Sequence, residues 1–365
     1  MQDFVHLHVH TQYSILDGQA SIPRLVDKAM ADGMKGIAVT DHGDMFGIKE
    51  FFNYVNKKNS STNSEIKDLK KRIAGLEKGT VECDNPETEL VACKEKLETA
   101  KKKLFKPIFG CEMYVARRRL FNKEGKPDQS GYHLVVLAKN EKGYHNLIKL
   151  VSKAWTEGFY MRPRTDRVEL EKYHEGLIVC TACIAGEVPR NIIAGKYEEA
   201  EEAIQWYKRV FGDDFYLELQ RHKATVPRAN HEAYKLQQIA NEKLIEYSKK
   251  FNVKLVCTND VHFVDEENAE AHDRLICLRA RRLLHTHAAA RLRYRTRQRG
   301  REPVGRTTPA AHHRPRLPCG SADPDTRRGY QLRRYPDRGG NRQSHDKTDG
   351  RTHQLRHRAP AVDDP

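Results

Sequence analysis

The sequence predicts an α/β barrel, and three observations carry that prediction. Short apolar runs rich in β-branched and aromatic residues recur, helical patterns separate most of them, and polar side chains follow where the runs end. The runs are 4–9, 37–41, 108–115, 133–138, 177–182, 215–220 and 254–259. Because strands and helices alternate with short links, we expect a parallel sheet closed into a (β/α)7 TIM-like barrel. Chemistry in such barrels gathers at the carboxyl ends of the strands.

Helical patterns fill most of the intervals between these strands. The first begins at Ile22, with Ser21 as its N-cap and Pro23 in its first turn, and Gly33 closes it. Later helices are predicted at 44–57, 141–158, 197–211, 229–251 and 266–278.

A Lys/Glu-rich segment, 60–104, interrupts this rhythm. Apolar residues recur in it at helical spacing: Ile66, Leu69, Ile73 and Leu76, then Leu90, Leu97 and Leu104. Residues 79–86 provide a turn between the two halves. We therefore expect an inserted, solvated antiparallel helical hairpin on a barrel loop, whose function the sequence does not reveal.

The net charge of +15 lies almost entirely in the C-terminal part of the chain. Residues 279–365 contain 21 Arg and 1 Lys against 8 acidic residues, whereas residues 1–278 contain 43 basic and 42 acidic ones. The neutral body gives no argument for a nucleic-acid surface there.

The same tail lacks Phe, Trp, Ile and Met, which predicts disorder. One interpretation is a basic arm for nucleic acid. The abrupt switch from lysine to arginine favours the other, that 279–365 is out-of-frame translation.

The eight cysteines are scattered along the chain, and no secretory signal pattern opens it. This usage is typical of a reducing cytoplasm rather than of a disulfide framework. No apolar run approaches about eighteen residues, so we expect no membrane span and a cytoplasmic location.

Three histidines, His6, His8 and His10, alternate with apolar residues in the first predicted strand. In a strand they would share one face, and each ring would need hydrogen-bond or metal partners. Neutral imidazole is the commonest metal ligand, so the run favours metal binding over a merely polar strand.

Further residues of ligand type stand at the ends of the other predicted strands. They are Asp17, Asp41, His42, Glu112, His133, Cys180, Cys183, His222, Asp260 and His262. Singly, each could be a helix cap or a small core residue. Together they predict a metal centre on one rim of the barrel.

Three of these motifs resemble the polymerase and histidinol phosphatase (PHP) domain: His8-Val9-His10-Thr11, Thr40-Asp41-His42-Gly43 and Asp260-Val261-His262. That resemblance implies a metal-dependent phosphoesterase with a distorted seven-stranded barrel. Longer stretches resemble the N-terminus of bacterial DNA polymerase III alpha subunits: 4–18, 45–51, 132–140 and 259–263. The resemblance covers 1–278 apart from the hairpin, and the tail matches nothing in that family.

The resemblance implies nine metal ligands, all of competent residue types: His8, His10, Asp17, His42, Glu112, His133, Cys183, Asp260 and His262. Among them Glu112, which would bridge ions, Asp260 and His262 are the expected catalytic residues. His6, Asp41 and His222 fall outside the set as supporting or substrate-facing residues, and Asp41 is expected to orient the His42 ring.

A mixed imidazole, carboxylate and thiolate set suits Zn²⁺ or Mn²⁺, and a bridging glutamate can hold two or three ions. The resemblance implies 3′→5′ exonuclease chemistry on a DNA 3′ end. It also implies polymerase modules and a proofreading subunit as partners in the full-length protein. The alternatives are a metal-stabilised docking module without catalysis and a histidinol-phosphatase-like phosphatase. No polymerase palm is recognisable, so we expect no nucleotide incorporation by this chain.

Overall fold

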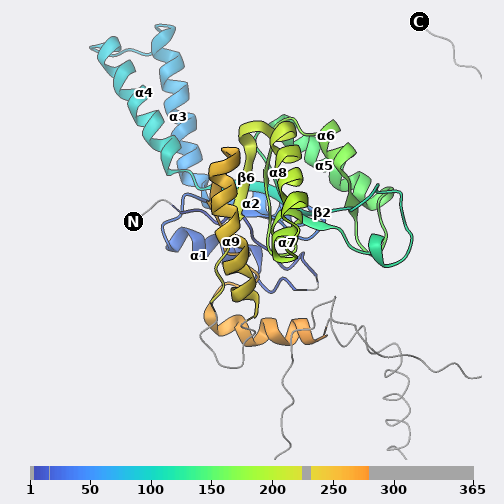
Figure 1. Ribbon diagram of the computed structural model, residues 1–365. Helices are drawn as coiled ribbons and strands as arrows, with labels where there is room; N and C mark the ends of the chain where they lie inside the picture. The colour runs from blue at the N-terminus through green and yellow to red at the C-terminus, as the bar shows by residue number, and fades with distance from the viewer. Residues whose placement is uncertain (1–3, 16, 224–231, 279–365) are drawn as a thin grey trace, which may run out of the picture. The chain divides into compact units, whose positions relative to one another are not determined.

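The computed structural model describes residues 4–15, 17–223 and 232–278, which form an α/β unit around a curled sheet (Figure 1). The strands are ordered β1-β2-β3-β5-β6-β7, and β4 pairs with β2 off this path. The predicted tail, 279–365, lies outside the described residues.

Six of the seven predicted strands are confirmed within one or two residues. The strands are β1 (Gly36–Val39), β2 (Lys106–Val115), β3 (Tyr132–Ala138), β4 (Arg164–Thr165), β5 (Leu177–Cys180), β6 (Phe215–Leu219) and β7 (Lys254–Cys257). The unpredicted β4 has two residues, too few to show any alternation.

The prediction of a parallel sheet is wrong at β3. The pairs β1–β2, β5–β6 and β6–β7 are parallel, whereas β3 is antiparallel to both β2 and β5. The connection from β2 to β3 contains only the 3-10 turn η1 (Lys126–Asp128). A parallel pair needs a long crossover, so this short return reverses the strand. The start of β3 therefore lies beside the end of β2, with His133 opposite Tyr114.

The predicted first strand, 4–9, is an extended segment that joins the two edges of the sheet. On one side the Ala38 N–H donates to the His6 carbonyl (2.8 Å). On the other, the His10 N–H donates to the Val261 carbonyl (2.7 Å), beyond the end of β7. Val9 and Val261 form an isolated parallel bridge. The segment thus lies between β1 and the chain that follows β7.

The predicted helices are confirmed where the structure describes them, except that α2 begins at Ile48 rather than at residue 44. They are α1 (Ile22–Ala31), α2 (Ile48–Lys58), α3 (Ser60–Glu77), α4 (Pro86–Lys103), α5 (Glu141–Thr156), α8 (Tyr197–Phe211), α9 (Glu232–Phe251) and a helix over 269–278. The short helices α6 (Arg167–Lys172) and α7 (Glu187–Ile193) were not predicted, because two turns carry little periodicity. Within the described ranges, no helix has the length and apolarity needed to cross a membrane.

The helical hairpin is confirmed as α3 and α4, which lie side by side and project from the rest of the unit (Figure 1). Ile73, Leu76 and Cys93 form its small apolar core. Its two ends meet at one amide side chain. The Asn59 Nδ2 donates to the Phe105 carbonyl (2.8 Å), and the Phe105 N–H donates to Asn59 Oδ1 (3.1 Å).

Alternating strand residues build two different cores. The outer face packs under the helices in a large apolar cluster that includes Met113, Leu134, Val136, Val179 and Leu217. The inner face carries a smaller cluster: Ala38, Val135, Leu137, Cys180 and Ala182. Burial of this apolar surface, at about 25 cal/mol per Å², is the main stabilising contribution. Polar residues occupy the same inner face at the end where β2 stops and β3 starts.

Candidate metal centre

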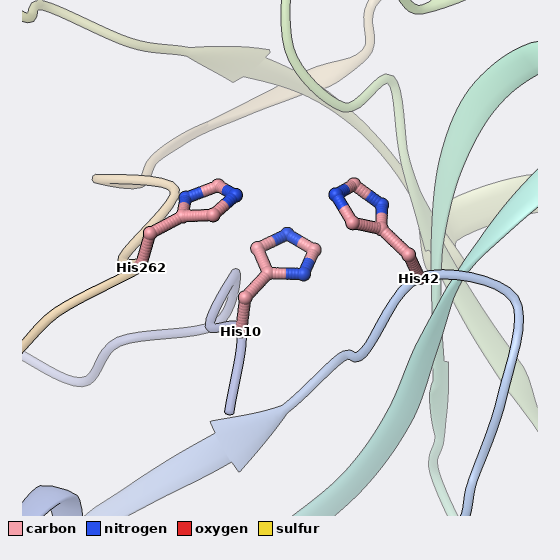
Figure 2. A group of neighbouring side chains, drawn as sticks. All are labelled: His10, His42 and His262. Atoms are coloured by element: carbon pink, nitrogen blue, oxygen red, sulfur yellow. The ribbon is translucent and has the colours of Figure 1, made fainter. Parts of the chain in front are cut away.

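The nine side chains predicted as ligands lie in one connected cluster at that end of the inner face. They are His8, His10, Asp17, His42, Glu112, His133, Cys183, Asp260 and His262. Figure 2 shows three of the imidazoles, which come from separate chain segments and face a common space.

Glu112 stands at the centre of the cluster. Its Oε1 lies 2.9 Å from His133 Nδ1 and 3.2 Å from His8 Nε2. Its Oε2 lies 2.6 Å from His42 Nδ1 and 3.5 Å from His10 Nε2. Burial acts to raise the pKa of this carboxyl, but the surrounding imidazoles outweigh burial and hold the pKa well below its usual range. Glu112 therefore stays ionised.

Asp260 connects the two histidines of the N-terminal segment. Its Oδ1 lies 3.2 Å from Nε2 of His8 and 3.2 Å from Nε2 of His10. Burial again opposes ionisation, but His8 and His262 lower the pKa of Asp260 below its usual range. Its backbone has φ +47°, a left-handed conformation that is uncommon outside glycine and that occurs at ligand-binding sites.

Several atoms of this cluster lack the hydrogen bonds that burial normally requires. Within the described residues, His8 Nε2, His10 Nε2, Glu112 Oε2 and Asp260 Oδ1 are buried and make none. An unsatisfied buried polar group costs about 1–3 kcal/mol. The separations of 3.2–3.5 Å between these atoms match the edge of about 3.4 Å expected for ligands around one tetrahedral ion at about 2.1 Å. The donor set therefore fits a metal.

His10 is held in the form that binds a cation. Burial, reinforced by the neighbouring His42 and His262, lowers its pKa to about 3. Its ring centroid lies 4.1 Å from that of His42 and 4.3 Å from that of His262 (Figure 2). The ring is therefore neutral at pH 7, and neutral imidazole is the ligand form.

Asp41 supports His10 rather than His42, so the expected role of Asp41 is corrected. Its carboxylate accepts hydrogen bonds from the Thr11 N–H (2.6 Å) and the Ser14 hydroxyl (2.8 Å). The Ser14 hydroxyl donates its proton to Asp41. Toward His10 Nδ1, 3.0 Å away, Ser14 Oγ therefore acts as an acceptor. That bond leaves the lone pair of His10 on Nε2, toward the cluster. Both ring nitrogens of His42 face other carboxylates.

Glu218 on β6 is a supporting residue that the sequence analysis missed. It is buried, and its Oε1 lies 2.7 Å from His8 Nδ1. It also accepts from Gln220 Nε2 (3.0 Å), the Ala182 N–H (3.1 Å) and the Thr258 hydroxyl. A proton held on His8 Nδ1 by this carboxylate leaves Nε2 as the ligand atom.

The structure separates His6 from the other two histidines of the first run, so the prediction that all three share a face is wrong. A bend at His8 breaks the alternation. Leu7 packs into the inner core, while His6 lies edge-on to Phe4 at 4.9 Å. Burial lowers the pKa of His6.

His222 contacts the backbone of the last ligand segment rather than the cluster. Its Nε2 lies 2.8 Å from the carbonyl of Asn259, which precedes Asp260. Its Nδ1 lies 2.9 Å from Gln237 Nε2.

The cluster has an open side. The side chains of His42, Asp260, His262 and His133 are between 16% and 21% exposed. Cys183 stands near this side, with its Sγ 3.7 Å from His133 Nδ1. Burial raises the pKa of the Cys183 thiol, so only a bound cation would favour the thiolate.

An α/β unit with a curled sheet that gathers imidazoles and carboxylates at one end defines the class of proteins with a candidate metal-binding centre. The PHP domain family matches residues 6–222, and the chain belongs to that family.

The chain is also similar to the N-terminal region of DNA polymerase III alpha subunits. It is 41% identical over 278 residues to that of Borreliella burgdorferi, 36% over 277 to that of Treponema pallidum and 34% over 290 to that of Aquifex aeolicus. These matches cover 75–78% of the chain but only 19–20% of each relative.

Among solved structures, one from Bifidobacterium adolescentis is provisionally assigned as a metal-dependent phosphoesterase. It covers 75% of this chain and 97% of its own, at 14% identity and a TM-score of 0.36. That score is too low to support an inference.

Proposed function

We propose that this chain is a metal-dependent phosphodiesterase that trims DNA from its 3′ end, as the PHP module of a DNA polymerase III alpha subunit. The observation that carries the proposal is the set of buried atoms on His8, His10, Glu112 and Asp260 that make no hydrogen bond within the described residues. The similarity to polymerase alpha subunits supports DNA as the substrate class.

The nine clustered side chains would hold two or three ions, with Zn²⁺ or Mn²⁺ favoured by the mixture of imidazole, carboxylate and thiol. Bound there, the ions would supply an activated water and would stabilise charge on the phosphate oxygens.

The residues of the chain have separable tasks. Glu112 and Asp260 remain ionised because imidazoles surround them, so they suit cation binding rather than proton donation. His262 Nδ1 lies 2.9 Å from the Asp260 carbonyl, which leaves Nε2 as its ligand atom. Glu218 and Ser14 fix the rings of His8 and His10.

The test is hydrolysis of a 3′-labelled single-stranded oligonucleotide by the purified chain with Zn²⁺ or Mn²⁺. Asp260→Ala should lower the rate by about 100-fold or more, since several kcal/mol of transition-state stabilisation depend on the centre. The matched control is Asp213→Ala, an exposed carboxylate in η2 (Gly212–Asp214). Metal-dependent activity that survives in Asp260→Ala at the wild-type rate rejects the proposal.

Two other outcomes identify the rival functions. Stoichiometric metal without hydrolysis of any phosphoester would indicate a metal-stabilised docking module. Turnover of a phosphate monoester such as histidinol phosphate, but not of single-stranded DNA, would indicate a phosphatase.

The proposal extends to partners and location. In a full-length protein the module would work beside polymerase modules and a proofreading subunit, in the cytoplasm. The chain alone is expected to incorporate no nucleotides, and template-directed extension by the pure protein would contradict that expectation.

A further inference from the structure

Three exposed aromatic side chains form a group beside the metal centre, here called the aromatic platform: Phe46, Trp155 and Phe159. The Trp155 ring lies 5.8 Å from that of Phe46 and stacks at 5.5 Å and 21° on that of Phe159. The three are 57%, 39% and 45% exposed, respectively. Contiguous aromatic surface left open to water in this way is typical of a binding site.

The platform is attached directly to the turn that carries a predicted ligand. The Trp155 indole N–H donates to the Gly43 carbonyl (2.8 Å), and Gly43 follows His42. The Gly43 N–H in turn donates to the Glu112 carbonyl (2.9 Å). Gly43 has φ +67°, and a Cβ there would lie 2.6 Å from Pro163. The platform therefore has a fixed position next to the centre.

An arginine stands on the same side of the centre without an acidic partner. The Arg162 guanidinium lies 5.6 Å from the Tyr114 ring centroid, and that ring stacks on His42 at 6.0 Å and 23°. Within the described residues no carboxylate lies in ion-pair range of Arg162, whereas Arg118 and Arg119 each have an aspartate partner. Arg162 is a cation available to an outside anion.

We propose that the aromatic platform and Arg162 bind single-stranded DNA, with unpaired bases stacked on the rings and a backbone phosphate paired with the guanidinium. Stacking surfaces combined with cations are how proteins hold single strands without reading their sequence. The unpaired cation favours a polyanion over an apolar protein partner. The delivery of a strand end to the metal centre rests on the proposed function, but binding itself does not.

The test measures binding without turnover, by fluorescence anisotropy in EDTA with the purified full chain. The probes are a labelled oligo-dT of about twelve nucleotides and an abasic strand of equal length, long enough for a typical single-strand site. The double variant Phe46→Ala/Phe159→Ala should bind oligo-dT about 10-fold or more weaker, at about 1–3 kcal/mol per stacked base, and bind the abasic strand as the wild type does. Arg162→Ala should weaken binding of both strands. It should also reduce the slope of log K against log salt concentration by the amount expected for about one phosphate contact.

Matched controls exist on α8. Tyr197→Ala removes an aromatic ring that is 45% exposed, like that of Phe159, and Arg209→Ala removes an exposed arginine. Both should bind oligo-dT like the wild type. Phe159→Tyr, which keeps a stacking face, should retain affinity and guards against misfolding of the double variant.

Equal affinity of the wild type for the two strands, or wild-type binding by the double variant, would overturn the proposal and leave the platform as a surface for protein. Either result leaves the phosphodiesterase proposal intact. Conversely, base-dependent binding by a protein that hydrolyses nothing would support this inference alone.

Discussion

Two buried polar sites in this barrel are built in opposite ways. Arg164 on β4 is fully buried, and its guanidinium is surrounded by backbone carbonyls. It donates to the carbonyls of Gly158 (3.1 Å), Asp128 (2.8 Å), Leu120 (2.9 Å) and Asn122 (3.0 Å). The candidate metal centre, buried apart from its open side, leaves atoms on His8, His10, Glu112 and Asp260 without hydrogen bonds in the described chain.

The difference separates a group that stabilises the fold by itself from one that needs a ligand. The hydrogen bonds of Arg164 offset its desolvation within the chain, so it organises the loops around β4. In the candidate metal centre, buried atoms make no hydrogen bond within the described residues, so a bound cation would offset their desolvation. Mutations in the two sites should therefore respond differently to metal.

The largest effect is expected at Arg164. Arg164→Met leaves four carbonyls without donors, so the free energy of unfolding should fall by about 4 kcal/mol or more. Urea denaturation followed by circular dichroism measures it. Arg209→Met, an exposed arginine, is the control and should change little. A loss as small as that of the control would mean that the loops do not depend on Arg164.

When the free metal concentration is 100 to 1,000 times the Kd for metal binding, the free energy of unfolding of the wild type should rise by about 3–4 kcal/mol. Asp260→Ala should lose most of this increment, while Arg164→Met keeps it despite its lower stability. Urea denaturation with Zn²⁺ and with EDTA measures both. The contrast between the two sites breaks down if Asp260→Ala responds to metal as fully as the wild type.

Glu218→Gln should weaken metal binding by about 10–100-fold, because the carboxylate that fixes the His8 ring is lost. Competition with a fluorescent chelator gives the affinity. Glu169→Gln removes another buried carboxylate, paired with Lys153 away from the centre, and should leave affinity unchanged. Equal affinities of the two variants would exclude a supporting role for Glu218.

The smallest effect is expected when a short Gly/Ser linker replaces residues 60–104. Asn59 and Phe105 hold the ends of the hairpin together, and distant sites perturb each other by about 0.5 kcal/mol or less. Metal affinity should therefore change by about 2-fold or less. A larger loss would assign the hairpin a part in the centre.

Much of the centre could be predicted because strand ends in a barrel meet at one rim. That rule brought Glu112, His42 and Asp260 together without any knowledge of their contacts. His133 was predicted at the start of a strand, which in a parallel barrel lies at the opposite rim. Only the antiparallel direction of β3 brings His133 to the rim of the other ligands. The reversal depends on the loop before it, which periodicity does not describe.

The supporting residues were harder to predict because they lie inside elements rather than at their ends. Glu218 alternates with Leu217 and Leu219 on β6, and a carboxylate on an inner face is the signal that could have identified it. His6 was misplaced because one bend at His8 changes which side chains face inward. Arg164 lies in a strand of only two residues, and the hydrogen-bond partners of its guanidinium are backbone carbonyls, which no sequence motif marks.

The extended N-terminal segment, which joins the sheet edges, has a consequence for the order of folding. Glu112 and His133 are brought together by a local chain reversal, whereas His8 and His10 must meet Asp260 across nearly the whole described chain. Closing so long a loop is entropically slow compared with local pairing. The half of the centre around Glu112 should therefore assemble first, and the full set of ligands becomes available to metal only when the two distant segments meet.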